Sequence, residues 1–260
     1  MKWVESFVLG LVQGVTEILP ISSDGHLAIL QYFLNIPVEM RVNLTAALHL
    51  GTALAIVSLF ARRISEIVRG VFATESAQRN CNRRLILMVV VSSLPAVVVG
   101  LLMGDFVEDI FVNLKAIGGF FFINGTFLLS TALVRKKESP LSWGRALLIG
   151  AIQATAIFPA ISRSGTTIAL ALLLGVNRYQ AFEFSFLLAI PITVGAAVYE
   201  LLHFDFSVIV WEQVAVGIVT AGLIGVLMIL LLRRFVLNRR FFLFGFYCWL
   251  VGVIVILFVR

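Results

Sequence analysis

Two short polar stretches within long apolar sequence hold the residues best able to do chemistry. The first, EILPISSDGH, supplies Glu17, Ser23, Asp24 and His26, and the second, PAISRSGTT, is centred on Arg163. Carboxylates are hard oxygen ligands that suit Mg²⁺ or Ca²⁺. His26 follows Ser23 by three residues, so on a first helical turn its ring can accept the serine proton. Because a guanidinium matches phosphate oxygens in geometry, the two stretches together predict phosphate chemistry.

Arg163 needs a partner, because a guanidinium within an apolar membrane region costs at least about 2.5–3.5 kcal/mol on insertion scales. Two partners are open from the sequence: a salt bridge to Glu17 or the phosphate of a ligand, and the two can coexist.

The hydroxyl groups of both stretches have a structural use as well, because serine and aspartate cap helices. The residues able to cap a helix beginning near Gly25 or Gly165 are Ser22, Ser23, Asp24, Ser162 and Ser164. Capping does not exclude function: two helix amino termini aimed at one point form a preformed anion site.

The elements that must position these residues are duplicated. The identities, at a constant offset of 140 positions, are Gly10 with Gly150, Gln13 with Gln153, Ile21 with Ile161, Ser22 with Ser162 and Gly25 with Gly165. They predict a repeated helix–loop–helix, against the alternative of a coincidental likeness. Duplicated segments broken by proline and glycine are, in membrane proteins, a pointer to the working site.

Composition places the chain in a membrane. It is 60% hydrophobic and 13% charged, with a mean hydropathy of +1.05, which leaves too little polar surface for a soluble globule. The amino terminus lacks the pattern of a cleavable signal, so we expect it to belong to the fold. The net charge of +6 lies in short loops, where it sets orientation and meets anionic lipids, so nucleic-acid binding is not expected. Cys81 and Cys248 indicate no disulfide.

Six segments are long and apolar enough to cross a bilayer, which takes about 20 residues. They are Leu44–Ala61, Leu85–Gly104, Lys115–Val134, Glu183–Leu202, Trp211–Leu232 and Arg240–Val259. Trp3–Leu34 and Trp143–Leu174 are instead each broken in the middle, which predicts two re-entrant hairpins.

Charge predicts how these elements are oriented. The basic clusters, expected in the cytoplasm, are Arg62/Arg63/Arg69/Arg79/Arg83/Arg84, Arg135/Lys136/Lys137/Arg145 and Arg233/Arg234/Arg239/Arg240; the acidic ones, expected outside, are Asp105/Glu108/Asp109 and Glu200/Asp205/Glu212. Three spans then separate the hairpins, which gives the two halves opposite topology. The predicted fold is a single all-α integral membrane domain, 1–260, with an inverted repeat of 1–137 and 138–260, each half a re-entrant hairpin plus three transmembrane helices.

The motifs resemble those of the bacterial undecaprenyl-diphosphate phosphatases of the bacitracin-resistance type. QGVTE, residues 13–17, fits the family's (E/Q)-x-x-x-E motif and is continued by LPISSDGH; PAISRSGTT is similar to its second signature, P-G-x-S-R-S-x-x-T. The likeness continues through His49–Thr52 and through residues 183–191, so it covers nearly the whole chain.

This resemblance implies hydrolysis of undecaprenyl diphosphate to the monophosphate carrier used in wall-glycan synthesis, and bacitracin resistance. It implies a divalent cation, Mg²⁺ or Ca²⁺, with Glu17 as a metal-binding or proton-handling carboxylate, and a multi-pass protein of the bacterial inner membrane whose site faces the periplasm or cell exterior. From its proximity in sequence, we expect Asp24 to be a second metal ligand beside Glu17. Ser23 would be the nucleophile, His26 its proton acceptor or a phosphate contact, and Arg163 the phosphate clamp. The residues expected to bind substrate around them are Gln13, Ser22, Gly25, Ser162, Ser164, Gly165, Thr166 and Thr167.

Three positions depart from the family's commonest pattern. Gln13 is the amide form of the first acidic position, Ala160 replaces a glycine and its Cβ would resist positive φ, and Asp24 stands where a small or hydroxylated residue is expected. We hypothesise that Asp24 restores the negative charge that Gln13 lacks.

Several alternatives stay open from the sequence. Water can replace Ser23 as the attacking group, and the same architecture serves transporters of a lipid phosphate or another anion. An enzyme of this fold acting on a different lipid phosphate is a third reading. The expected partners are the polyprenyl diphosphate and membrane lipids, with a homodimer left open.

Three further features of the sequence concern packing and charge pairing. Phe120–Phe122 and Phe241–Phe246 are either contacts for the lipid tail or, as we favour, ordinary packing aromatics. Arg178 and Glu183 are interpreted as a charge pair at the start of a helix. His49 either joins the site or packs between helices.

Overall fold

The computed structural model describes residues 3–111, 113–134, 138–203 and 211–258. These residues form an all-helical molecule whose one isolated β-bridge joins Ser139 to Val176. The helices are α1 (Trp3–Ile18), α2 (Ser23–Phe33), α3 (Val38–Gly70), α4 (Ser76–Phe111), α5 (Leu114–Ser130), η1 (Thr131–Leu133), α6 (Trp143–Gln153), η2 (Ala154–Ile157), α7 (Arg163–Leu173), α8 (Arg178–His203), α9 (Trp211–Leu237) and α10 (Leu243–Phe258).

Five helices are long and apolar enough to cross a membrane. Within the described residues they are α3, α4, α5, α8 and α9, and each overlaps one of the predicted spans, although the predicted Lys115–Val134 runs past the end of α5. The sixth predicted span corresponds to α10, which has only 16 described residues and begins three positions later than expected. The reason is a turn at its start, where Arg239 has a φ of 59° and the Leu243 N–H bonds to the Arg240 carbonyl. Several apolar helices therefore make this a multi-pass membrane protein.

The two segments predicted to be broken are each split into short helices. Pro20 and Pro159, which have no N–H to donate, lie in the breaks. Ser22 and Ala160 there adopt φ angles of 66° and 64°, which no helix accommodates. Helix α2 then starts with the Ser22 side chain as its cap, and α7 starts with Ser162, each accepting from the backbone N–H three residues on. The positive φ at Ala160 also means that this loop does adopt the conformation its Cβ disfavours.

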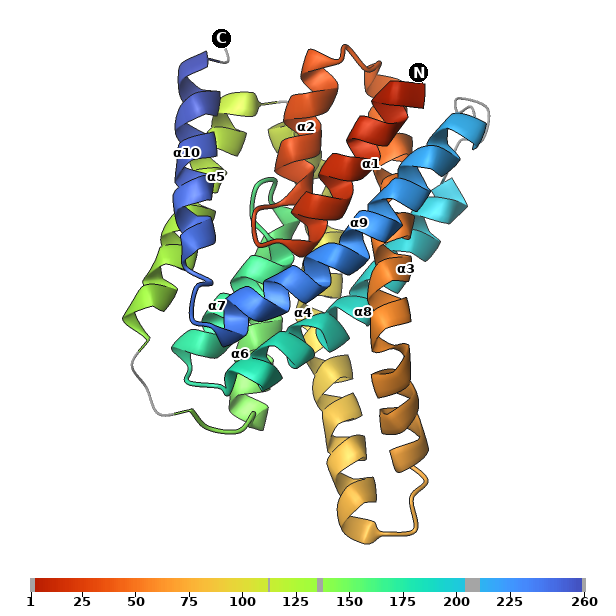
Figure 1. Ribbon diagram of the computed structural model, residues 1–260, viewed down its shortest axis with the longest axis vertical. Helices are drawn as coiled ribbons and strands as arrows, with labels where there is room; N and C mark the ends of the chain where they lie inside the picture. Colours follow the sequence, from red (N-terminus) through yellow and green to blue (C-terminus); the bar gives the residue numbers. More distant parts are fainter. Residues whose placement is uncertain (1–2, 112, 135–137, 204–210, 259–260) are drawn as a thin grey trace.

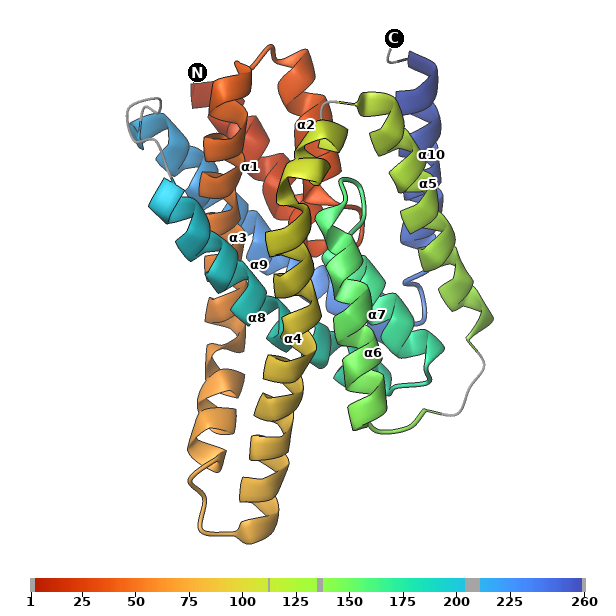
Figure 2. The ribbon, with the colours of Figure 1, turned by 180° about the vertical axis from the view of Figure 1, so that it is seen from behind.

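The first helix of each broken segment packs against a helix from the other half of the chain. Helix α1 lies along α9, and α6 lies along α4 (Figures 1 and 2). Glycine allows both approaches: a methyl group at Gly10 would overlap the backbone of Gly217, and one at Gly150 would overlap that of Ser92. The molecule is thus held together by contacts between its early and late segments.

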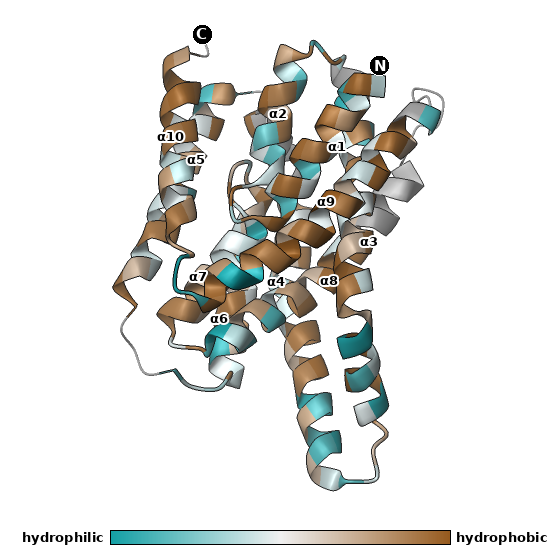
Figure 3. Ribbon diagram, in the orientation of Figure 1, coloured by the Kyte–Doolittle hydropathy of each residue, from teal (hydrophilic) through white to brown (hydrophobic). Residues whose placement is uncertain are grey.

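Helices α3 and α4 project well beyond the other helices (Figures 1 and 2). Their shared tip is hydrophilic in Figure 3, whereas the middle of the bundle is largely hydrophobic. Within α3, Arg62 pairs with Glu66 across one helical turn, and Arg63 pairs with Glu183 of α8 at 2.5 Å. Because Glu183 is taken by Arg63, the predicted pair of Arg178 with Glu183 is wrong.

Some of the charged residues from which orientation was predicted lie outside the described part of the structure. This holds for Arg135, Lys136, Lys137 and Asp205, and for the side chains of Asp105, Glu108, Asp109 and Glu200.

Candidate active site

Glu17 is the centre of the cluster formed by the two polar stretches. It lies in the last turn of α1, and its side chain is only 11% exposed. One carboxylate oxygen accepts a hydrogen bond from Arg163 Nη2 at 2.8 Å. The other accepts from the Ser23 hydroxyl at 2.5 Å and lies 3.3 Å from His49 Nε2. The structure therefore brings three of the four predicted catalytic residues, Glu17, Ser23 and Arg163, into direct contact.

A salt bridge between Glu17 and Arg163 joins the two broken segments. Both side chains are mostly buried, at 11% and 15% exposure, and they come from opposite halves of the sequence. Removing one partner from a buried pair typically destabilises by about 3–5 kcal/mol, because it leaves an unpaired charge. The salt bridge that the sequence left open is thus present, and Arg163 stands at the first position of α7.

A side chain absent from the sequence prediction ties the two loops together. Asn124 of α5 is 1% exposed. Its Nδ2 donates to the Pro20 carbonyl at 3.1 Å, and its Oδ1 accepts from the Ser162 N–H at 3.3 Å. A second link between the stretches is the Ser164 hydroxyl, which donates to the Ile18 carbonyl at 3.1 Å. The two helix starts are therefore held in one fixed relation.

His26 lies beside the loops but is directed away from Ser23. One ring nitrogen is 2.7 Å from the Ser22 carbonyl oxygen, and the other is 2.8 Å from the Tyr247 hydroxyl. The ring also stacks on Tyr247 and meets the edge of Phe121. The hydrogen bond expected from the three-residue spacing is thus replaced by one from Ser23 to Glu17, because the carboxylate reaches the hydroxyl from the preceding helix.

The hydroxyl groups predicted to cradle phosphate bond to the protein. Ser22 and Ser162 cap their helices. Thr166 and Thr167 donate to carbonyls of their own first turn, and Thr167 also meets the Ser185 hydroxyl of α8 at 2.6 Å. Gly25 and Gly165 supply the capped N–H groups, and a methyl at either would crowd the opposite loop. Substrate contact by these residues remains a prediction.

Gln13 has one partner within the described structure. Its Nε2 lies 3.4 Å from the Thr52 hydroxyl of α3, and its Oε1 is buried without a hydrogen bond. Gln153, its match in the repeat, is 2% exposed and has neither side-chain atom bonded.

The carboxylates predicted to hold a metal share a histidine. His49 Nε2 lies 3.3 Å from Glu17 and 3.7 Å from Asp24. Among the described residues no group of three or more His, Cys, Asp or Glu side chains could by itself hold a metal ion. Two carboxylates nevertheless fit Mg²⁺, which is commonly bound by one or two carboxylates together with substrate phosphates and water. They fit Ca²⁺ less well, because it takes six to eight oxygen ligands.

Comparison with known proteins assigns the family. A family model described as "Bacitracin resistance protein BacA" matches residues 6–254. The chain belongs to the BacA family. A protein of Methanococcus maripaludis strain C7, named undecaprenyl-diphosphatase, is 38% identical over 258 residues, which cover 98% of this chain and all of the relative. The undecaprenyl-diphosphatase of Thermosipho africanus is 37% identical over 95% of this chain and 96% of its own length. Undecaprenyl-diphosphatase 3 of Bacillus cereus is 35% identical over 99% and 97%.

Membership of the BacA family confirms the resemblance drawn from the motifs. The site residues that sequence reasoning missed are Asn124 and Tyr247, together with the firm placement of His49. Asn124 gave a usable signal, because a buried amide within an apolar span needs a partner. Tyr247 gave no such signal, because it lies in a segment rich in aromatic residues, where one more aromatic side chain does not stand out.

Proposed function

We propose that this chain hydrolyses undecaprenyl diphosphate to undecaprenyl phosphate and inorganic phosphate, recycling the lipid carrier of wall-glycan synthesis and giving resistance to bacitracin. The observation that carries the proposal is the contact of Glu17 with both Arg163 and Ser23 at the meeting point of two helix starts. The names of the BacA relatives agree with it.

The reaction follows from what each group offers. The diphosphate replaces Glu17 as the partner of Arg163, whose guanidinium matches phosphate oxygens and neutralises charge on the transferred phosphoryl group. The starts of α2 and α7 add their positive dipole ends. Glu17, released from Arg163, keeps its other oxygen beside the Ser23 hydroxyl and can take its proton.

The covalent step is attack by Ser23 on the terminal phosphorus. The Ser23 Oγ–P bond forms, the bridging P–O bond breaks, and the lipid monophosphate leaves. Water then attacks the phosphoserine, with Glu17 handling the proton, and releases inorganic phosphate. In this scheme His26, held by Ser22 and Tyr247, orients the start of α2.

A divalent cation, Mg²⁺ in preference to Ca²⁺, belongs to the proposal as well. Glu17 and Asp24 would hold it, and when bound it would offset negative charge on the diphosphate.

The proposed architecture is an inverted repeat of residues 1–137 and 138–260, with re-entrant hairpins α1–α2 and α6–α7 and α10 as a sixth span. It is supported by packing between the two halves: α1 of the first half packs on α9 of the second, and α6 of the second half packs on α4 of the first. The basic residues of the α3–α4 tip, under the positive-inside rule, favour that end as cytoplasmic. The α1–α2 hairpin opens at the opposite end (Figure 1), which favours a site reached from the periplasm or cell exterior of an inner membrane.

The test is phosphate release from a C55 diphosphate by the purified chain. Ser23→Ala should lower kcat at least about a hundredfold, while Ser130→Ala, whose hydroxyl bonds only within its own helix, should not. Substrate labelled at its terminal phosphate should leave label on residue 23. Near-full activity of Ser23→Ala would exclude serine attack in favour of water. Movement of the diphosphate across liposomes without phosphate release would instead favour the transporter alternative.

A further inference from the structure

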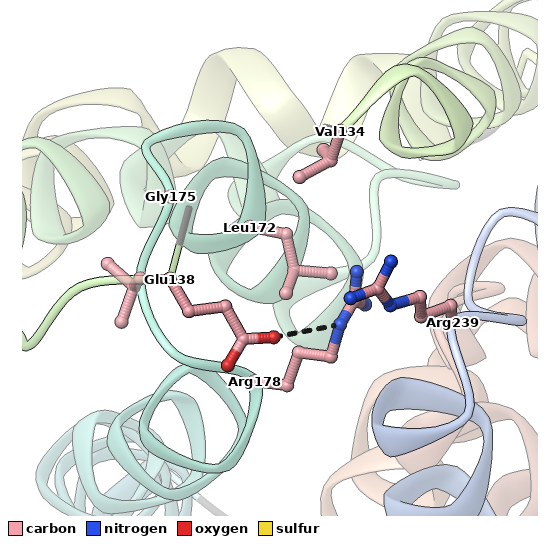
Figure 4. A pocket seen from close by; sticks show the side chains of 7 residues that line it. Val134, Glu138, Leu172, Gly175, Arg178 and Arg239 are labelled. Carbon is pink, nitrogen blue, oxygen red and sulfur yellow. Dashed lines mark ion pairs between the residues drawn. The ribbon is translucent and has the colours of Figure 1, made fainter. Parts of the chain in front are cut away.

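A small cavity lies at the far end of α7 from the active site. It has a volume of about 50 Å³ and lies where α7 ends, α8 begins and α9 turns into α10. Its lining residues are Val134, Glu138, Leu172, Gly175, Val176, Arg178 and Arg239 (Figure 4). Leu172 follows Arg163 by nine positions in α7, so at 1.5 Å per residue the cavity is about 14 Å from the catalytic cluster.

Positive charge exceeds negative charge in this cavity. The guanidinium groups of Arg178 and Arg239 lie next to each other, and one carboxylate, Glu138, lies 3.3 Å from Arg178 Nε (Figure 4). The other oxygen of Glu138 accepts a hydrogen bond from Asn177 at 2.7 Å, so this carboxylate also has a second partner. Two neighbouring cations that share one carboxylate favour a bound anion.

Hydrogen-bond donors in the cavity are also incompletely used. The Arg178 side chain is 12% exposed; its Nη1 donates to the Val236 carbonyl, but its buried Nε has no well-aligned acceptor. Arg239 is an exposed residue, and within the described residues its guanidinium has neither a hydrogen bond nor an ion pair to the protein. Guanidinium N–H groups that converge without acceptors are the donors with which proteins bind phosphate.

The backbone places Arg239 here at a cost. Its N–H bonds to the Val236 carbonyl and the next N–H to the Phe235 carbonyl, which makes it the residue that ends α9 in the left-handed region, with a φ of 59°. Helices favour glycine at that position, because a side chain is strained there. An arginine in such a conformation is an outlier that points to a use for its side chain.

We propose that this cavity binds the phosphate group of an anionic lipid headgroup, with Arg178 and Arg239 as its two ligands. The volume suits a compact polar group, with the remainder of the lipid outside. The cavity lies among helix ends, where headgroups meet a membrane protein, and basic pockets between transmembrane helices are suited to anionic lipids. Free inorganic phosphate offers the same chemistry, so the test must separate the two sources.

The test uses the full chain in nanodiscs of phosphatidylcholine with or without phosphatidylglycerol. Native mass spectrometry counts retained phosphatidylglycerol, and the melting temperature reports its stabilising effect. Arg239→Gln should bind phosphatidylglycerol about tenfold more weakly than the unsubstituted chain, because one charge-assisted contact is lost. The matched control is Arg240→Gln, which removes the same charge at a neighbouring exposed residue outside the lining and should bind as the unsubstituted chain does.

A second variant separates ligand loss from a change of fold. Arg239→Lys keeps the cation at the strained position, so it must retain more phosphatidylglycerol than Arg239→Gln. If phosphatidylglycerol has no effect but inorganic phosphate raises the melting temperature in an Arg239-dependent way, the site stands and its ligand is free phosphate. If Arg239→Gln and Arg240→Gln respond alike to both ligands, the proposal is overturned.

Discussion

Replacing Asn124 by leucine, which has a similar volume but no polar atoms, should detach the two loops of the active site from each other. In the structure the amide satisfies the Pro20 carbonyl on one loop and the Ser162 N–H on the other. Leucine satisfies neither, while leaving the surrounding packing of α5 largely filled.

The size of the effect follows from those two contacts. A buried polar group that loses its partner typically costs about 1–3 kcal/mol, so two groups give about 2–6 kcal/mol of lost unfolding free energy. Part of this will be recovered if the loops move apart to find other partners. Such a movement would separate Glu17 from Arg163, and a misplacement of about 1 Å can cost about a hundredfold in rate.

Two measurements on Asn124→Leu check this reasoning. Equilibrium unfolding in mixed micelles gives the stability, and phosphate release from a C55 diphosphate gives kcat and KM. The control is Thr220→Val, which removes a hydroxyl that bonds only its own helix in α9. Asn124→Leu should lose stability and kcat together, whereas Thr220→Val should change neither appreciably. If the two variants match in kcat and differ by less than about 1 kcal/mol in stability, the bridging role of Asn124 is wrong.

Three further outcomes are expected. Tyr247→Phe removes one hydrogen bond from His26 and should lower kcat by about three- to tenfold in the phosphate-release assay; an unchanged kcat would show that the bond does not orient the α2 start. Gly150→Ala places a methyl group on the backbone of α4 and should destabilise by about 1–3 kcal/mol in equilibrium unfolding, whereas Gly144→Ala, which meets open space, should not; equal effects would contradict the close packing. Asp24→Asn should raise the Mg²⁺ concentration needed for half-maximal phosphate release, and an unchanged requirement would remove Asp24 from the metal site.

Much of the fold could be predicted because the signals were local. A proline inside a long apolar segment indicates a broken helix. The serine that follows, Ser22 or Ser162, indicates where the next helix begins. Glu17 was one of the two partners predicted for Arg163, because a cation in such surroundings must be neutralised, and the structure shows their salt bridge.

The remaining parts of the site depend on packing between distant helices. The spacing of Ser23 and His26 permitted a contact, but the choice between His26 and Glu17 as the partner of Ser23 depends on how α1 and α2 pack. The start of α10 was predicted three residues too early because apolar character continues through the turn before it.

The contact between Glu17 and Arg163 has a consequence for the order in which the protein can be completed. The two residues are 146 positions apart, and ribosomes add about 5–20 residues per second, so Glu17 is made roughly 7–30 s before its cation exists. During that time the growing chain must keep the carboxylate hydrated, protonated or close to another partner such as His49, which is made much sooner. The α1–α2 segment therefore cannot reach its final electrostatic state until α7 has been synthesised, and a chain terminated before Arg163 would leave that carboxylate without its arginine in the membrane.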